Sequence, residues 1–453
     1  MAGASPRILL AGMAGTLMQF AMLSIFVLAC FGSSNPQAPA MTKIRLGPEA
    51  LASVNEDGGA LRCEPSVAMH GDKIVVSWND SFGGRKGSET GVAVAWALSR
   101  DRGQTYRFGG YLAPGPGSVV SGADSRLATD EAGRFFLLVL QWLEGQQTLR
   151  FYRTDSAAFG TWEEMAAPDT TSGEPHIDKP ALAVGRDGRI AIAYDRSKRT
   201  AIVTSRDGGK SWSAPKTISD TTDSIRSGAG VAFVADSLVV AWMEGKGMKV
   251  TELWSASSSD GGKQFGAPSR VHRLAAPMPD PKGFAIAYGP YSLSGCDACL
   301  AAISDTLHLT CVEGAGGGSR ILLFSSADRG KTWSTPESVG KSPDRALKIF
   351  PSLALAGAKP AVLAYDRRTA PDGARTDVFL SVRTAAGVYE DIQLNTVSTD
   401  WLKVPGDMDH APIQRNFGDY ISLASDGRGL VAAWTDGRSG LPRIYTRVVD
   451  LDD

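Results

Sequence analysis

The chain has 453 residues, and its 47 Lys and Arg residues nearly balance 48 Asp and Glu residues, giving a formal net charge of -1. Because such a chain offers no broad basic surface, we expect no nucleic-acid partner. Hydrophobic residues make up 43% of the chain and charged residues 21%, which is the composition of a folded globular protein and excludes an intrinsically disordered one.

The N-terminus carries an apolar run. Residues 8–30 follow a single basic residue, Arg7, and predict a signal peptide or a membrane anchor over residues 1–29. The run ends in Val-Leu-Ala-Cys, which resembles a bacterial lipoprotein signal with Cys30 as the lipidated residue. Plain cleavage and a retained anchor remain open. In each case we expect an exported protein at the outer surface of a bacterial membrane, periplasmic or extracellular, with residues 30–40 as a flexible tether.

Four further cysteines follow Cys30: Cys63, Cys296, Cys299 and Cys311. An even number in an exported protein indicates disulfide bonds, whose three possible pairings the sequence does not separate. A redox or zinc role for Cys296-x-x-Cys299 is less favoured, because no second such pair and no paired histidines accompany it. We predict no metal site and no cofactor.

From residue 41 to residue 453 the chain alternates short apolar runs with Gly- and Asp-containing turns, and helical periodicity is nearly absent. One unit consists of an extended run at 179–184, a turn at 186–189, a second run at 190–196 and a third at 200–205. A fourth short strand would complete an antiparallel four-stranded sheet. The sequence therefore predicts one all-β domain over residues 41–453.

This unit recurs along the domain. Its copies begin about 50 to 70 residues apart, a spacing that suits the four-stranded blades of a β-propeller, and they start near residues 64, 124, 179, 227, 299, 350 and 418. We predict seven blades, with six as the alternative. The last unit ends after its third run, so we expect residues 42–46 to supply its outer strand and close the ring. We also expect a monomer.

A second repeat lies near the end of four units. The stretch 326–333 contains the Gly-Lys-Thr of a phosphate-binding loop, but Ser325 stands where that loop needs its first glycine. The same pattern, Ser-x-Asp-x-Gly with an aromatic residue at its end, recurs at 99–106, 205–212 and 258–265. The Ser and Asp side chains can bond to the turn's own backbone, and Trp333 can pack between sheets. We therefore interpret the motif as structural.

This motif resembles the Asp-box, or BNR repeat, of the sialidase superfamily, and the resemblance extends over residues 41–453. It implies a β-propeller and a glycoside hydrolase of the exo-α-sialidase type, acting on glycans that contain sugar acids. Two features depart from the sialidase pattern. Sialidases have six blades, and the place of their Arg-Ile-Pro signature here reads Cys63-Glu64-Pro65. Arg62 is offset by one residue, which turns it to the opposite face of a strand.

Polar residues that end a second strand or start a first strand are expected to converge on one face of a propeller, around its channel. Second-strand ends supply Asp80, Asp195, Arg196, Glu244, Glu313, Asp366, Arg367, Asp436 and Arg438. First-strand starts supply Asp124, Arg126, Asp178, Lys179, Arg226, Lys348, Arg415, Asp419 and Tyr420. Any of these could instead form a salt bridge between blades. Together, the repeated Asp-Arg pairs suit an anionic or hydroxyl-rich ligand.

The sialidase resemblance assigns roles to some of these residues. Tyr420 opens a Tyr-x-Ser-Leu segment like the one that holds the sialidase nucleophile, and Glu313 or Asp366 could take its proton. Asp80 lies near the region of the family's acid/base residue. The residues expected to bind the substrate are Arg196, Arg367, Arg438, Arg226 and Arg126.

Two long connections, 267–295 and 394–415, link a fourth strand to the next first strand, which predicts that they lie on the channel face. Tyr288, Tyr291 and Trp401 in these loops could stack on a sugar or could pack within the loops.

Three functions therefore compete. The first is a sialidase-like hydrolase that binds a glycan or a small sugar-acid ligand. The second is a non-catalytic propeller that binds glycans or a protein partner at the cell surface. The third is a polysaccharide lyase or endoglycanase.

Overall fold

The computed structural model describes residues 43–55, 61–81, 92–112, 121–143, 145–155, 159–219, 224–246, 249–277, 299–370, 375–384, 387–404 and 418–452. The predicted signal or anchor segment, the tether, Cys30, Cys296, Tyr288 and Tyr291 lie outside these ranges. Within them, the regular structure is β-strand apart from a 3-10 turn, η2 (Trp401–Lys403). No helix in the described part is long and apolar enough to cross a bilayer.

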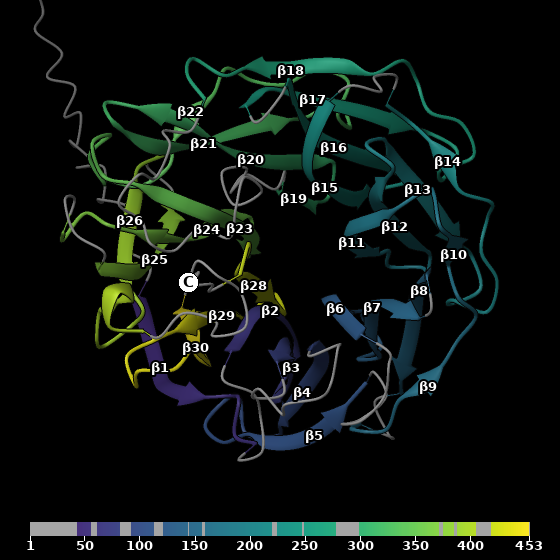
Figure 1. The fold of residues 1–453 in the computed structure, drawn as a ribbon. Coiled ribbons are helices and arrows are strands. Elements are labelled where there is room, and N and C mark those ends of the chain that lie inside the picture. Colours follow the sequence, from purple (N-terminus) through teal and green to yellow (C-terminus); the bar gives the residue numbers. More distant parts are fainter. Residues whose placement is uncertain are drawn as a thin grey trace, which may run out of the picture. The chain divides into compact units, whose positions relative to one another are not determined.

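The strands form seven antiparallel sheets arranged in a ring (Figure 1), which confirms the predicted seven-bladed propeller. Blade 1 consists of β2 (Leu61–His70), β3 (Lys73–Ser81), β4 (Val92–Ser99) and β5 (Arg107–Tyr111). Blade 2 consists of β6 (Ser121–Thr129), β7 (Phe135–Leu143), β8 (Gln146–Thr154) and β10 (Asp169–Ser172), with the short β9 (Glu163–Glu164) also on β8. Blade 3 consists of β11 (Ile177–Val184), β12 (Ile190–Arg196), β13 (Thr200–Ser205) and β14 (Lys216–Thr217).

The remaining blades follow in chain order. Blade 4 consists of β15 (Ser224–Val234), β16 (Ser237–Lys246), β17 (Lys249–Ser258) and β18 (Ser269–Arg273). Blade 5 consists of β19 (Cys299–Ile303), β20 (Thr306–Ala315), β21 (Gly318–Ser326) and β22 (Glu337–Ser338). Blade 6 consists of β23 (Lys348–Ala356), β24 (Lys359–Asp366), β25 (Arg375–Arg383) and β26 (Tyr389–Gln393), with β27 (Thr399–Asp400) also on β25. Blade 7 consists of β28 (Ser422–Ser425), β29 (Gly429–Asp436), β30 (Arg443–Asp452) and β1 (Lys43–Leu51).

The second strand of each blade is a nearly continuous apolar run rather than an alternating one. In β29 every residue is buried, and in β12 the first five residues are. Each sheet in a ring has a neighbouring sheet on either side, so both faces of a central strand are covered by protein. This is why the second runs were recognisable in the sequence as short apolar segments between turns.

The ring closes through the N-terminal strand. β1 pairs antiparallel with β30, with Leu46 opposite Val449 and Leu51 opposite Tyr445. Without β1, the outer edge of β30 would present unpaired backbone groups. The predicted donor segment is therefore confirmed, and it extends beyond residue 46.

The four Ser-x-Asp-x-Gly turns share one hydrogen-bond pattern. In the turn at 326–333, the Ser326 hydroxyl donates to Asp328 Oδ1 at 2.8 Å and accepts from Gly330 N at 2.8 Å. The Asp328 carboxylate in turn accepts from the backbone and the hydroxyl of Thr332. Gly330 has a φ of 80°, and a Cβ there would lie 2.9 Å from Val239 in the preceding blade. Only glycine fits this place.

The aromatic residue of each of these turns packs on the preceding blade. Trp333 donates its indole N–H to Ser255 of blade 4 at 3.0 Å, and Trp212 donates to the carbonyl of Ala166 in blade 2 at 2.9 Å. The Tyr106 hydroxyl accepts from Thr446 of blade 7 at 3.0 Å. The motif thus shapes a turn and joins neighbouring blades.

No disulfide bond joins any two of the described cysteines, Cys63, Cys299 and Cys311, contrary to the expectation of disulfides among them. Cys63 and Cys311 are buried in blades 1 and 5, where they fill space as small apolar side chains.

Replacing Trp333 by alanine should lower the free energy of unfolding by about 2 kcal/mol, somewhat less than for a fully buried Trp, because the side chain is half-buried. Chemical denaturation measures the change. Trp333→Phe is the matched control, since Phe265 occupies the same place in blade 4, and it should lose less. An unchanged midpoint in the alanine variant would show that the residue does not hold the blades together.

Deleting residues 41–51 should lower the free energy of unfolding by about 3 kcal/mol or more, because the variant loses several ladder hydrogen bonds worth roughly 0.5–1.5 kcal/mol each. The exposed edge of β30 should also cause aggregation. Thermal melting and size-exclusion chromatography measure both effects, with deletion of residues 1–40 as the control. A monomer of unchanged stability would rule out closure by β1.

Candidate active site

The inner strands of five blades share an irregularity at the same place. Pairing with the second strand shifts register after Cys63, Ala123, Asp178, Ser227 and Ile349. In four of these strands the residue that follows the shift has a positive φ, namely 56° at Glu64, 52° at Asp124, 49° at Lys179 and 55° at Phe350. Such bulges re-aim a side chain, and non-glycine residues in this conformation often occur at functional sites. Three of the four have ionisable side chains.

Glu64 and Asp124 are both buried and are held together by a neighbouring amide. Asn79 donates from Nδ2 to Glu64 Oε2 at 2.7 Å, and its Oδ1 accepts from the backbone N–H of Asp124 at 3.2 Å. The backbone N–H of Asp419 in blade 7 donates to the other Glu64 oxygen at 3.0 Å. Residues of blades 1, 2 and 7 therefore fix the position of this carboxyl pair.

The two carboxyl groups differ in protonation. Burial raises the pKa of Glu64 well above its usual range, and the charges of Asp124 and Asp419 add to this effect against the attraction of Lys179. Burial also opposes ionisation of Asp124, but Lys179, Arg126 and hydrogen bonds from Glu64 and Asp178 lower its pKa. Asp124 is therefore an ionised carboxylate that receives a hydrogen bond from a protonated Glu64.

Asp178 and Lys179 come from blade 3. Lys179 Nζ lies 2.8 Å from Asp419 Oδ2 and 3.9 Å from Asp124 Oδ1. Burial opposes the charge of Lys179, but the surrounding carboxylates raise its pKa well above the usual value. The pKa of Asp178 is raised to about 6 by the protein around it and by its neighbour Asp124, although its side chain is exposed. Asp178 is thus an exposed carboxyl group whose pKa the neighbouring Asp124 helps to raise.

Tyr420 lies against these groups from the start of blade 7. Its hydroxyl donates to Asp124 Oδ1 at 3.3 Å. The Arg126 guanidinium lies 3.7 Å from the centre of its ring, a cation–π contact. Burial raises the pKa of Tyr420 well above its ordinary value. The phenol is therefore neutral, and the carboxylate beside it can accept its proton.

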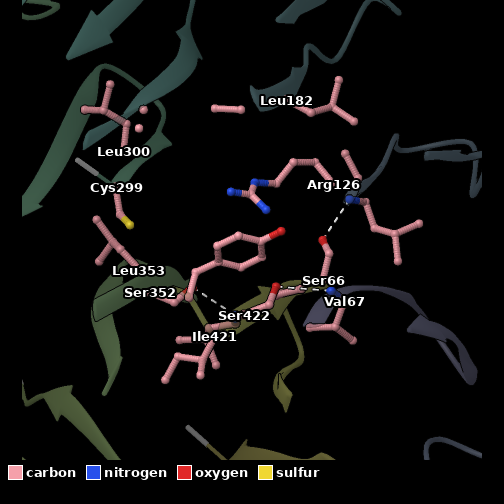
Figure 2. Close-up of a pocket in the computed structure, with 18 of the residues that line it drawn as sticks. Ser66, Val67, Arg126, Leu182, Cys299, Leu300, Ser352, Leu353, Ile421 and Ser422 are labelled. Atoms are coloured by element: carbon pink, nitrogen blue, oxygen red, sulfur yellow. Dashed lines mark hydrogen bonds between the residues drawn. The ribbon is translucent and has the colours of Figure 1, made fainter. Parts of the chain in front are cut away.

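A cavity of about 350 Å³ opens beside this group, lined by the inner strands. Arg126, Lys179, Asp419 and Tyr420 form its polar wall. Figure 2 shows the Arg126 side chain reaching into the cavity, with Leu300 and Cys299 on the opposite side. We call this end of the channel, with Glu64, Asp124, Arg126, Asp178, Lys179, Asp419 and Tyr420, the channel mouth.

Serines join the inner strands to one another around the cavity (Figure 2). The backbone N–H of Leu127 donates to Ser66 Oγ at 2.8 Å, and that of Val67 donates to Ser422 Oγ at 3.1 Å. The backbone N–H of Leu423 likewise donates to Ser352 Oγ at 3.0 Å. Ser422 and Leu423 of the Tyr-x-Ser-Leu segment therefore join the inner strands to one another. Tyr420 is the residue of this segment that can take part in chemistry.

Of the predicted site residues, Tyr420 and Arg126 meet at the channel mouth. Asp80 is fully buried and lies 3.2 Å from Arg62, with further hydrogen bonds from Asn55 and Trp78. Arg62 is buried and donates to the carbonyl oxygens of Ser53 and Asn55. Glu313 is buried too. It contacts Arg320 at 2.8 Å and His272 at 3.3 Å, and it accepts from the backbone N–H of Ala275 at 2.9 Å.

The other predicted residues have partners in their own part of the ring. Arg196 lies 3.1 Å from Asp169, and Arg438 lies 2.6 Å from Asp436. Arg438 also forms a salt bridge with Glu49. Asp366 forms a salt bridge with Arg368 at 2.7 Å, and the side chain of Arg367 is buried. The Arg226 side chain lies outside the described residues, although its backbone pairs with Glu244. The catalytic roles of Asp80 and Glu313, and the binding roles of these arginines, stay predictions.

Trp401 is buried in the core shared by blades 6 and 7 and donates to Thr376 at 2.7 Å. It packs within the protein, so it is not open to a sugar. Sequence reasoning missed Glu64 and Asn79 as members of the site. One signal was present: proline follows three of the four residues with positive φ, at Glu64-Pro65, Lys179-Pro180 and Phe350-Pro351, and proline within a strand marks such an irregularity.

No model of a known protein family matches the chain, and neither does any curated protein. Solved structures do match. An α-L-arabinofuranosidase, Arb93A from Fusarium graminearum, is 10% identical with a TM-score of 0.50, over 90% of this chain and 98% of its own. An ulvan lyase of family PL25, bound to -[GlcA(1-4)Rha3S]-, is 10% identical with a TM-score of 0.50, over 89% and 95%.

Sialidases are also among the structural neighbours. The intramolecular trans-sialidase of the leech is 13% identical with a TM-score of 0.41, over 88% of this chain and 70% of its own. The chain shares the propeller fold of the arabinofuranosidase and the lyase. At these identities a common fold does not carry a common activity, so function has to be argued from the site.

Proposed function

We propose that this protein is a glycan-active enzyme that cleaves glycosidic bonds at the channel mouth. The observation that carries the proposal is the Tyr420 hydroxyl, hydrogen-bonded to the ionised Asp124 beside a cavity. A second carboxyl group, Asp178, lies beside Asp124 and has its pKa raised to about 6. A retaining glycosidase with a tyrosine nucleophile needs three groups: the nucleophile, a base for its proton and an acid for the leaving group.

In the first step, the Tyr420 oxygen attacks the anomeric carbon while its proton passes to Asp124. Asp178 gives its proton to the glycosidic oxygen, and the bond between that oxygen and the anomeric carbon breaks. In the second step, water attacks the anomeric carbon and loses a proton to Asp178. The tyrosyl–sugar bond breaks and Asp124 returns its proton to Tyr420, so the enzyme is regenerated and one water is consumed.

Asp124 is essential in this scheme because of the burial of Tyr420. A buried phenol with a raised pKa is a poor nucleophile unless a base accepts its proton as the new bond forms. Arg126 over the ring favours the partial negative charge on the Tyr420 oxygen as the phenol loses its proton. Lys179 near Asp124 keeps this carboxylate ionised before the step, so that it can accept the proton. Glu64 and Asn79 hold the carboxylate in place.

The narrower hypothesis, an exo-α-sialidase, shares Tyr420 with this proposal and requires a set of arginines for the substrate's carboxylate. A binding module without turnover is the alternative function, and glycan binding in the absence of any product would select it. We also propose, from the apolar run at residues 8–30, that the protein acts outside the cytoplasm. Fractionation that recovers it only from the cytoplasm would argue against this location.

Replacing Tyr420 by phenylalanine should lower turnover by at least about 100-fold, because the variant keeps the ring beneath Arg126 and loses the attacking oxygen. A panel of fluorogenic glycosides that includes a sialoside provides the assay. Tyr445→Phe is the matched control, since Tyr445 belongs to the same blade and also lies beneath an arginine, Arg438. Retention of most of the turnover by the Tyr420 variant would remove this residue as the nucleophile.

The rate should fall as the pH rises above about 6, because the general acid must be protonated and the pKa of Asp178 is about 6. The expected decline in kcat/KM approaches tenfold per pH unit. Asp178→Asn should abolish this limb of the profile and leave a low, pH-independent rate. A wild-type profile that stays flat from pH 6 to pH 8 would mean that another group is the acid.

A further inference from the structure

The channel mouth holds more carboxyl groups than cationic groups among the side chains that the structure describes there. The carboxyl groups are Glu64, Asp124, Asp178 and Asp419, and the cationic groups are Lys179 and Arg126. Whether the channel mouth can bind an acidic sugar depends on how many cationic side chains it holds and on which protein groups these side chains already contact.

Lys179 is already bound by the protein's own carboxylates. Its Nζ lies 2.8 Å from Asp419 and 3.9 Å from Asp124, and its side chain is only 20% exposed. A carboxylate on a sugar would compete with Asp419 for this ammonium. It would also approach the ionised Asp124, and like charges at short distance in a partly buried site repel strongly.

Arg126 is also held by contacts within the protein. Its guanidinium lies 3.7 Å from the centre of the Tyr420 ring, and Nη1 donates to the carbonyl of Ser125 at 3.1 Å. A bidentate bond to a substrate carboxylate requires the guanidinium edge in a fixed orientation. Arg196 and Arg438, two other candidates for such a bond, each hold a carboxylate of their own chain.

Carboxyl groups suit a different ligand. A carboxylate accepts hydrogen bonds from neighbouring sugar hydroxyls, and Asp178 is exposed where it could do so. We propose that the channel mouth takes uncharged, hydroxyl-rich sugars and excludes sugar acids. This inference rests on the proposed function in that it concerns the same site, but it is a statement about binding and can be tested without turnover.

The test is equilibrium binding of the full chain to fluorescently labelled oligosaccharides. The probes are neutral arabino-, manno- and galacto-oligosaccharides, sialyllactose and oligogalacturonate. We expect at least one neutral probe to bind at least tenfold more tightly than either acidic probe. Tighter binding of an acidic probe, or no binding of any probe, would overturn the inference.

A single substitution sharpens the test. Asp419→Asn removes the main partner of Lys179, so binding of the acidic probes should increase about tenfold. Asp426→Asn is the matched control, because Asp426 belongs to the same blade, pairs with Arg102 and does not itself line the cavity. This substitution should change the affinity for neither the neutral nor the acidic probes. Unchanged binding of acidic probes to the Asp419 variant would contradict the role given to Lys179.

Turnover separates this inference from the proposed function. Neutral probes that bind but are never cleaved would refute the enzyme and support the inference. Cleavage of an acidic probe in preference to neutral ones would support the enzyme and refute the inference.

Discussion

Closure of the ring by β1 and β30 is the constraint on which the rest of this structure depends. The channel mouth draws on residues at both ends of the domain: Glu64 from blade 1, Asp419 and Tyr420 from blade 7. These residues are more than 350 positions apart in the chain. They meet because the N-terminal strand completes the last blade and so brings blades 7 and 1 side by side. A fold that joins its ends in this way makes a polar site from distant parts of the sequence without burying a loop.

Within the closed ring, the bulges give the site its chemistry. A regular strand would alternate its side chains between two sheet faces, whereas a residue at positive φ breaks that alternation and points its side chain elsewhere. Glu64, Asp124 and Lys179 occupy this place in three successive blades. Two buried carboxyl groups and one ammonium are thereby brought close enough for their protonation to be coupled, which leaves Asp124 ionised next to the phenol of Tyr420.

The architecture was readable from the sequence because it is repeated. Apolar second strands, the Ser-x-Asp-x-Gly turns and the short last unit are local patterns, and together they predicted seven blades and the closing strand. The rule that first-strand starts line the channel also brought Tyr420 and Arg126 to the same place, and it included Asp124, Asp178, Lys179 and Asp419.

The rule for second-strand ends was less informative, for a physical reason. Residues two apart in a strand lie on the same face, and the indole N–H groups of Trp78 and Trp434 donate to Asp80 and Asp436, each two residues further on. These carboxylates are thereby engaged inside the blades. Glu64 was missed because the sequence pattern assumes that side chains alternate between the two faces of a strand. This pattern does not indicate where a bulge interrupts the alternation. The contacts that decide protonation also come from three other blades, which no local pattern reveals.

The most direct test of this account is to trap the covalent intermediate. The protein is incubated with a fluorinated glycosyl fluoride of a sugar that it releases, digested, and examined by mass spectrometry. The account predicts one added glycosyl group on the peptide that contains Tyr420. A label on a carboxylate such as Asp124, or sustained turnover with no label on Tyr420, would contradict it.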